Sequence, residues 1–256
     1  MKYIVANWKM NLGVRESIAL ARSVLRSVRG HEETPEIILC PSATSLAEVH
    51  KVLARSKVKL GAQDCGPQKS GAYTGEISPL MLKDVGCSHA IIGHSERRAL
   101  GESDEIINRK LLAALENDLM PILCVGEPLD IRENGGAIEY VQQQIAAALD
   151  GVRLSRKQRL FISYEPIWAI GSGKYAEVAD VVEMHSVIEN DVLKRLDINR
   201  EQLIILYGGS VLEENVYSFL REKMIDGVLV GGASLKLRQF KGIIDAGREV
   251  LTAQSI

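Results

Sequence analysis

The stretch YEPIWAIGSGK, from Tyr164 to Lys174, directly follows an apolar run that has the character of a β-strand. Glu165 stands at the end of that run, where Pro166 prevents the strand from continuing in the centre of a sheet. Gly171 and Gly173 then permit positive φ angles at the tip of a loop. A carboxylate at a strand end beside an apolar, glycine-tipped loop can be exposed to a substrate and then shut away from water. Taken alone, the stretch fits equally well a surface loop whose glutamate is only solvated.

Outward from this stretch, strand-like and helix-like segments alternate along the chain. Eight short apolar runs predict strands at residues 3–8, 36–40, 58–63, 89–92, 120–125, 160–164, 203–206 and 226–230. Segments with helical periodicity predict helices at residues 15–29, 46–54, 106–117, 138–149, 178–196, 213–221 and 240–251. Ser42 is a candidate cap for the second helix. Residues 64–78 are polar and glycine-rich without periodicity, which predicts a projecting loop with a role of its own.

This alternation implies parallel strands joined by right-handed crossovers. The strands are almost continuously hydrophobic, as at residues 37–39 and 203–206, so we expect both faces of the sheet to be covered. A closed (β/α)8 barrel fits the strand count without leaving an edge. A doubly wound open sheet is the alternative, but it would require a glycine fingerprint where this chain has Asn7-Trp8-Lys9. We see no linker or charge run, so residues 1–256 are predicted to form a single α/β domain.

Composition limits the class of partner. The chain has 31 basic and 33 acidic residues and a formal net charge of −2, which argues against nucleic acid or an anionic membrane as the main partner. Four widely separated cysteines (Cys40, Cys65, Cys87 and Cys124) have no CxxC spacing and no nearby histidine cluster. They predict reduced thiols in a cytoplasmic protein, without a metal site. No apolar run approaches the roughly 20 residues of a membrane helix, and the first residues do not resemble a signal peptide.

Polar residues and glycines that look out of place all follow predicted strands. They are Asn7 and Lys9, His94 and Ser95, Glu165, Gly208 to Ser210, and Gly231 and Gly232. Because all strands of a parallel barrel point the same way, we expect these residues to converge on one rim. Convergence of this kind is what a binding or catalytic site requires.

Each polar residue has both a chemical and a structural interpretation. Lys9 would supply fixed positive charge to an anionic substrate, or it is an ordinary surface lysine, and Asn7 could simply cap a turn. A helix capped by Ser95 would disfavour an imidazolium, so His94 would stay neutral as a hydrogen-bond donor and proton shuttle. A lone histidine can equally be a structural residue. Glu96 is most simply part of an ion-paired scaffold around the rim.

Paired glycines indicate the class of ligand. Gly208-Gly209 and Gly231-Gly232 remove side chains at two neighbouring strand ends, and the second pair opens a short helix. Bare backbone N–H groups at a helix start bind phosphate without an arginine. Tight turns would also explain the glycines, but their position after the seventh and eighth strands favours phosphate.

Five motifs in this chain resemble the triosephosphate isomerase family, in the family's order and over nearly the whole chain. They are ANWKMN (Ala6 to Asn11), GHSERR (Gly93 to Arg98), YEPIWAIGSGK, YGGSV (Tyr207 to Val211) and LVGGASL (Leu229 to Leu235). Residues 62–78 are similar to the family's dimer loop, and residues 124–135 also match. The chain departs at Ser172, where the family often has threonine, and at Asp64, where asparagine is common.

The resemblance implies a TIM barrel that interconverts dihydroxyacetone phosphate and D-glyceraldehyde 3-phosphate without a metal or organic cofactor. In the general scheme of this family, Glu165 would be the base, while neutral His94 and Lys9 would stabilise the enediolate oxygens with help from Asn7. Backbone groups would hold the phosphate at Gly171, Ser210, Gly231 and Gly232. A lid would close over it, latched by Tyr207 and Ser210. That lid comprises Pro166, Ile167, Trp168, Ala169, Ile170, Gly171, Ser172, Gly173, Lys174, Tyr175 and Ala176.

The resemblance also implies a homodimer through the 64–78 loop, with Thr74 reaching the partner's pocket near Asn7 and Lys9. Two other functions remain open at this point. A Schiff-base aldolase on the same barrel would need a desolvated lysine, for which Lys59 is the candidate within a strand. A non-catalytic phosphate-binding protein could also keep the same fold.

Overall fold

Eight parallel strands form a closed barrel in chain order, with β1 pairing both β2 and β8. The computed structural model describes residues 1–31, 33–170 and 175–254. The strands are β1 (Tyr3–Asn7), β2 (Glu36–Cys40), β3 (Lys59–Ala62), β4 (His89–Ile92), β5 (Met120–Val125), β6 (Leu160–Tyr164), β7 (Leu203–Tyr207) and β8 (Gly227–Val230). The closed barrel predicted from the sequence is confirmed, and the open sheet is excluded.

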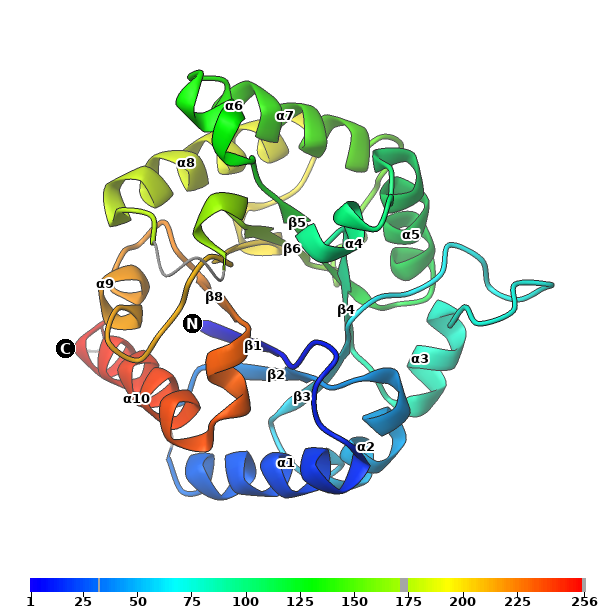
Figure 1. The fold of residues 1–256 in the computed structure, drawn as a ribbon, viewed down its shortest axis with the longest axis vertical. Helices are drawn as coiled ribbons and strands as arrows, with labels where there is room; N and C mark the ends of the chain where they lie inside the picture. The colour runs from blue at the N-terminus through cyan, green and yellow to red at the C-terminus, as the bar shows by residue number, and fades with distance from the viewer. Residues whose placement is uncertain (32, 171–174, 255–256) are drawn as a thin grey trace.

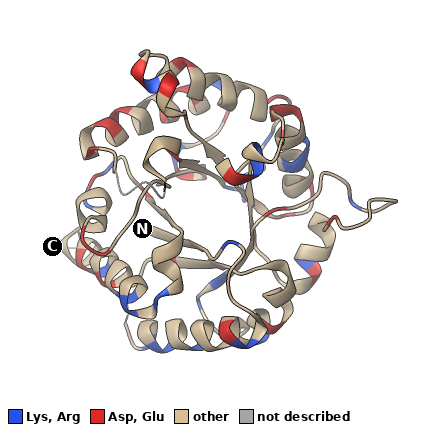
Figure 2. Cartoon of the chain, viewed as in Figure 1, with Lys and Arg blue, Asp and Glu red and all other residues tan. Residues whose placement is uncertain are grey.

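Helices form a ring around this barrel (Figure 1). The α-helices are α1 (Val14–Val28), α2 (Leu46–Leu53), α3 (Pro79–Val85), α4 (Ser95–Ala99), α5 (Asp104–Glu116), α6 (Leu129–Glu133), α7 (Ala137–Ala148), α8 (Val178–Arg195), α9 (Val216–Leu220) and α10 (Leu237–Gln254). Short 3-10 helices occur at η1 (Ala43–Ser45), η2 (Ile167–Ala169), η3 (Arg200–Gln202) and η4 (Gly232–Leu235). Charged residues of both signs are spread over the outer helices, which agrees with the absence of a one-sided charge run (Figure 2).

Several short helices differ from the sequence prediction. The sequence reasoning missed α3, although Ser78 Oγ accepts the N–H of Met81, Pro79 opens the helix and Gly86 ends it with φ of 100°. The prediction that Ser42 caps α2 is wrong. A 3-10 turn, η1, intervenes, and the Ser42 hydroxyl contacts the hydroxyls of Thr44 and Ser45 instead of a backbone N–H.

Successive strand residues pack alternately into the barrel and against the helices, as parallel strands with two covered faces require. Tyr3 and Val5 belong to the interior cluster, which also contains Phe161, whereas Ile4 and Ala6 belong to the layer beneath the helices. All five are nearly or completely buried. The strands are continuously hydrophobic because their side chains fill two cores, the barrel interior and the layer between the strands and the helices.

The barrel interior also holds a buried histidine near the amino-terminal ends of the strands. His89, the first residue of β4, packs edge-on against Phe161 with ring centroids 5.0 Å apart. Its Nδ1 lies 2.8 Å from Ser88 Oγ, and its Nε2 has no partner among the described residues. Burial, together with the nearby cations Lys59 and Arg159, lowers the pKa of His89 to about 3. The native protein therefore holds this imidazole neutral.

We predict that His89→Phe makes the free energy of unfolding depend less on pH below about pH 6.5. The unfolded chain binds a proton at His89 below about pH 6.5, whereas the native state does so only near pH 3, so stability is lost as the pH falls through this window. Urea unfolding between pH 7 and pH 4.5 should show a slope smaller by up to about 1.4 kcal/mol per pH unit in the variant. An unchanged slope would contradict a neutral, buried His89.

Candidate active site

The predicted site residues lie at the carboxyl ends of five strands. Asn7 is the last residue of β1, His94 follows β4 by two residues and Glu165 directly follows β6. Ser210 follows β7, and Gly231 directly follows β8. Because the strands are parallel, these ends form one rim, as the sequence predicted. Of the predicted substrate-binding residues, Gly171 lies outside the described part of the chain.

Glu165 and His94 face each other across this rim. His94 Nε2 lies 3.6 Å from Glu165 Oε1, which is somewhat beyond hydrogen-bond distance. The other oxygen, Oε2, accepts the backbone N–H of Ser95 at 3.3 Å. Both side chains are buried, with Glu165 only 1% exposed. The carboxylate is therefore removed from water, and Oε1 has no hydrogen-bond partner among the described residues. The Cys124 thiol lies close to the carboxylate, because burial and then the charge of Glu165 raise the pKa of this thiol.

The protonation of His94 follows from its contact with α4. Its Nδ1 lies 3.2 Å from the backbone nitrogen of Glu96, and an amide N–H can only donate, so Nδ1 must be the unprotonated acceptor. The imidazole is then neutral, with its proton on Nε2, the atom that faces Glu165. His94 itself is the cap of α4, so the prediction that Ser95 caps this helix is wrong.

Lys9 is held in a strained backbone conformation. Its φ is 52°, a region that non-glycine residues seldom occupy. Asn7 Oδ1 accepts the N–H of Lys9 at 3.0 Å, and Gln63 Nε2 donates both to Lys9 O at 2.8 Å and to Cys40 O at 2.9 Å. The Lys9 ammonium forms an ion pair with Glu96 Oε1 at 2.8 Å. Glu96 thus belongs to an ion-paired scaffold, as the sequence suggested.

The sequence reasoning missed Gln63, although a usable signal was present. Gln63 directly follows β3, so it obeys the same rule of polar residues at strand ends that identified Asn7 and Glu165. The apolar pattern instead predicts Gln63 as the last residue of the third strand, which ends one residue earlier.

The two glycine pairs serve different purposes. A Cβ on Gly208 would lie 2.8 Å from Glu165 Cγ, and a Cβ on Gly209 would lie 2.4 Å from the Tyr207 hydroxyl oxygen, so these glycines make room for neighbouring side chains. A Cβ on Gly231 would lie 3.4 Å from Lys9 Cε, and one on Gly232 would meet no atom within 4 Å. Only the second pair therefore leaves open space at the rim, and it opens the 3-10 helix η4.

A buried carboxylate anchors the first part of the predicted lid. Glu127 Oε1 accepts from Trp168 Nε1 at 3.0 Å, from the Tyr164 hydroxyl at 3.1 Å and from Arg132 at 3.3 Å. The Arg132 guanidinium also lies over the Trp168 ring, 5.0 Å from its centroid. Burial, and then the charge of Glu127, raise the pKa of Tyr164, so its hydroxyl stays a donor. The sequence reasoning did not identify Glu127, because no strand-end rule connects it with a tryptophan 41 residues later.

The last part of the lid returns to the rim beside Tyr207. Ala176 is buried, whereas Tyr175 is exposed. Burial raises the pKa of Tyr207 to about 12. The backbone groups of Ala176 and Ser210 oppose this rise, because both lie beside the hydroxyl. The intervening lid residues Gly171, Ser172, Gly173 and Lys174 lie outside the described residues.

Metal-binding clusters and membrane spans do not occur in the described part of the chain. Within residues 1–31, 33–170 and 175–254, no three His, Cys, Asp or Glu side chains are grouped so as to hold a metal ion. No helix within the same ranges is long and apolar enough to cross a membrane. The four cysteines are buried free thiols, as predicted.

We predict that Gln63→Glu lowers kcat/KM by about 10 to 100-fold, because the carboxylate would face two backbone carbonyls and release Lys9 from its strained position. Steady-state kinetics would measure the loss. The exposed Gln254→Glu, at the end of α10, is the matched control and should behave as the original protein. Equal kinetics for both variants would show that Gln63 does not position Lys9.

Comparison with known proteins identifies the family. The family model for triosephosphate isomerase matches residues 2–247. The triosephosphate isomerase of Aquifex aeolicus is 46% identical over 244 residues, which cover 95% of this chain and 98% of the relative. The triosephosphate isomerase of Dictyoglomus turgidum is 44% identical over 245 residues, which cover 95% of this chain and 98% of that relative. The crystal structure of triosephosphate isomerase from Bartonella henselae superposes with a TM-score of 0.84 at 35% identity, covering 96% of this chain and 99% of that one. The chain belongs to the triosephosphate isomerase family.

Proposed function

We propose that this protein interconverts dihydroxyacetone phosphate and D-glyceraldehyde 3-phosphate through an enediolate, with Glu165 as the base and neutral His94 as the electrophile. The observation that carries the proposal is the placement of Glu165 Oε1 3.6 Å from His94 Nε2 at the barrel rim. Family membership supports the substrate pair and the reaction type. The chemistry requires only that one proton move between adjacent carbons.

Glu165 suits the role of base because its two oxygens differ. Oε2 is fixed by the Ser95 N–H, and buried Oε1 has no hydrogen-bond partner among the described residues. The oxygen without a donor is the one that can approach a proton of the substrate. Glu165 would take the proton from the carbon beside the carbonyl and return it to the neighbouring carbon.

His94 and Lys9 suit the stabilisation of the developing negative charge. The neutral imidazole presents Nε2–H, which can donate to an enediolate oxygen and shuttle a proton between the two oxygens. Lys9 adds a positive charge. Its ion pair with the half-exposed Glu96 is of a kind that contributes about 1 kcal/mol or less, so a substrate anion can replace Glu96 as the partner of Lys9. Asn7 assists by holding the Lys9 backbone.

The phosphate would lie against the open glycines beyond β8. Gly231 is adjacent to the Lys9 side chain, and Gly232 has open space in front of it. Backbone N–H groups at the start of η4 would bind a phosphate in that space. Ser210 and Gly171 would complete the phosphate site, and the lid from Pro166 to Ala176 would close over it to keep the enediolate from losing phosphate to water.

A Schiff-base aldolase is less well supported by this arrangement. Lys59 is the first residue of β3, so it lies at the end of the barrel opposite Glu165, and it is exposed. An exposed lysine lacks the desolvation that makes an amine nucleophilic at neutral pH. Borohydride trapping with substrate would distinguish the two reactions.

We predict that Glu165→Gln lowers kcat by about 10² to 10⁴-fold in a coupled assay with glyceraldehyde 3-phosphate, because an amide cannot accept the proton. Glu105→Gln on the outer helix α5 is the matched control and should retain full activity. If the Glu165 variant keeps activity within about tenfold of the original protein, the assignment of the base fails.

We also propose that the protein acts as a homodimer through the 64–78 loop. This loop extends away from the barrel beside α3 (Figure 1). Residues 69–76, including Thr74 at its tip, are exposed in the single chain, and so are the nearby apolar side chains of Leu80 and Met81. Such a surface is suited to burial against a second subunit. Thr74 would reach the partner's pocket near Asn7 and Lys9.

We predict that Thr74→Arg produces a folded monomer in sedimentation velocity and lowers kcat by about 10²-fold, because Lys9 loses the support of the partner's loop. Thr252→Arg on α10 is the control, and should leave both the association state and kcat unchanged. A folded monomer with unchanged turnover would show that each subunit is complete on its own.

A further inference from the structure

A large cavity opens at the end of the barrel opposite Glu165. Its volume is about 950 Å³, and its wall includes Ile37 near the start of β2 and Lys59 at the start of β3. The last turn of α1, residues 29–31, 34 and 35, and residues 55–58 between α2 and β3 form the remaining sides. The cavity, here called the basal pocket, lies at the amino-terminal ends of the strands and is therefore separate from the rim that carries Glu165.

The basal pocket is strongly positive. Five Lys and Arg side chains line it: Arg26, Arg29, Arg55, Lys57 and Lys59. Among its described lining residues, Glu36 is the one carboxylate. None of the five cations forms an ion pair with a residue in the described part of the chain, and all five are exposed. A chain with a net charge of −2 has thus gathered, in one hollow, five cations that form no ion pair with a described residue.

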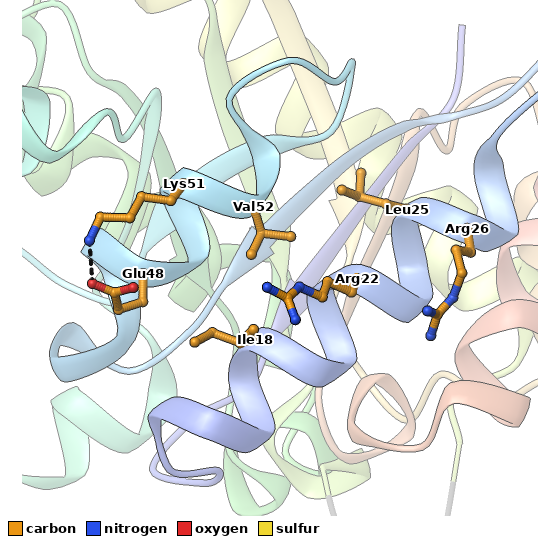
Figure 3. A pocket seen from close by; sticks show the side chains of 7 residues that line it. All are labelled: Ile18, Arg22, Leu25, Arg26, Glu48, Lys51 and Val52. Carbon is orange, nitrogen blue, oxygen red and sulfur yellow. Dashed lines mark hydrogen bonds and ion pairs between the residues drawn. The ribbon is translucent and has the colours of Figure 1, made fainter.

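The interior of the pocket is apolar. Leu25, Val28, Pro35, Ile37 and Val58 contribute to its lining, and the last three are buried. A cleft of about 480 Å³ between α1 and α2 shares Leu25 and Arg26 with it. Figure 3 shows Leu25 and Val52 facing this cleft from the two helices. The basal pocket itself therefore pairs apolar walls with a cationic edge.

Helix dipoles account for only part of this charge. Arg26 lies in the last turn of α1, Arg29 follows that helix and Arg55 follows α2. Positive charge at these positions stabilises the helices, because it interacts favourably with the negative carboxyl end of each helix dipole. Lys57 and Lys59 lie beyond the last turn of either helix, in the connection to β3 and on its first residue. The same pocket has the size of pockets that bind small organic molecules, which are commonly 300 to 1,000 Å³ by a rough estimate.

We propose that the basal pocket binds a small organic polyphosphate with the chemistry of a nucleoside di- or triphosphate. The guanidinium and ammonium groups at the edge would pair with the phosphate oxygens, and the apolar walls would cover the base. The occupant lies at the opposite end of the barrel from the catalytic rim, so it does not compete with the triose phosphate. The proposal is independent of the isomerase assignment.

The test is titration calorimetry of the full chain with ATP at low salt and without divalent metal. We expect saturable binding of one ATP per chain, and at least tenfold weaker binding to the Arg29→Glu/Lys57→Glu variant. The control is Arg153→Glu/Arg156→Glu, which makes the same charge change at exposed residues outside the pocket and should bind within twofold of the original protein. Arg55→Gln/Lys57→Gln repeats the test with a smaller charge change, and all variants should keep kcat/KM within twofold.

Two further measurements separate binding in the basal pocket from nonspecific attraction of anions and from binding at the catalytic rim. ATP should bind more tightly than tripolyphosphate, which lacks the apolar body, and more tightly than adenosine, which lacks the charge. The proposal is overturned if ATP does not bind saturably, if both charge-reversal variants weaken binding equally, or if tripolyphosphate binds as tightly as ATP. It is also overturned if ATP inhibits the isomerase competitively with an inhibition constant equal to its calorimetric Kd, since ATP would then occupy the catalytic rim.

Discussion

The parallel pairing of β1 with β8 closes the sheet, and the remaining architecture depends on that closure. Tyr3 pairs with Gly227, and Ala6 pairs with Val230. The contact is so close that a Cβ on Gly227 would lie 2.2 Å from the carbonyl oxygen of Tyr3, so only glycine fits there. Closure leaves no edge strand and brings all eight carboxyl ends to a single rim. Residues as distant in sequence as Lys9 and Gly231 thereby become neighbours.

At that rim, one short helix organises both groups proposed to react. The first turn of α4 donates one backbone N–H to Glu165 Oε2 and the next to His94 Nδ1. The first contact leaves Oε1 as the oxygen that can take a proton, and the second leaves Nε2 as the nitrogen that carries one. Two backbone N–H groups therefore set which oxygen of Glu165 and which nitrogen of His94 face each other. The proposed chemistry needs this asymmetry in both groups.

The sequence predicted the barrel and the rim residues well, because both depend on local patterns. Four predicted strands, residues 36–40, 89–92, 120–125 and 160–164, have the observed bounds, since each is a continuous apolar run between turn or polar residues. Short helices were less predictable, because five or seven residues give too little periodicity. Gln63 and Glu127 also follow strand ends, but their partners are carbonyl groups, a hydroxyl and an indole that only the folded chain brings to them.

The state of His94 is the most direct test of this organisation. We would record ¹⁵N NMR spectra of the protein with its histidine rings labelled, at pH 8, and assign His94 with a His94→Gln variant. The geometry predicts the neutral tautomer with a proton on Nε2 and an unprotonated Nδ1 that accepts the N–H of Glu96. A neutral His94 ring protonated on Nδ1 would contradict the arrangement of base and electrophile.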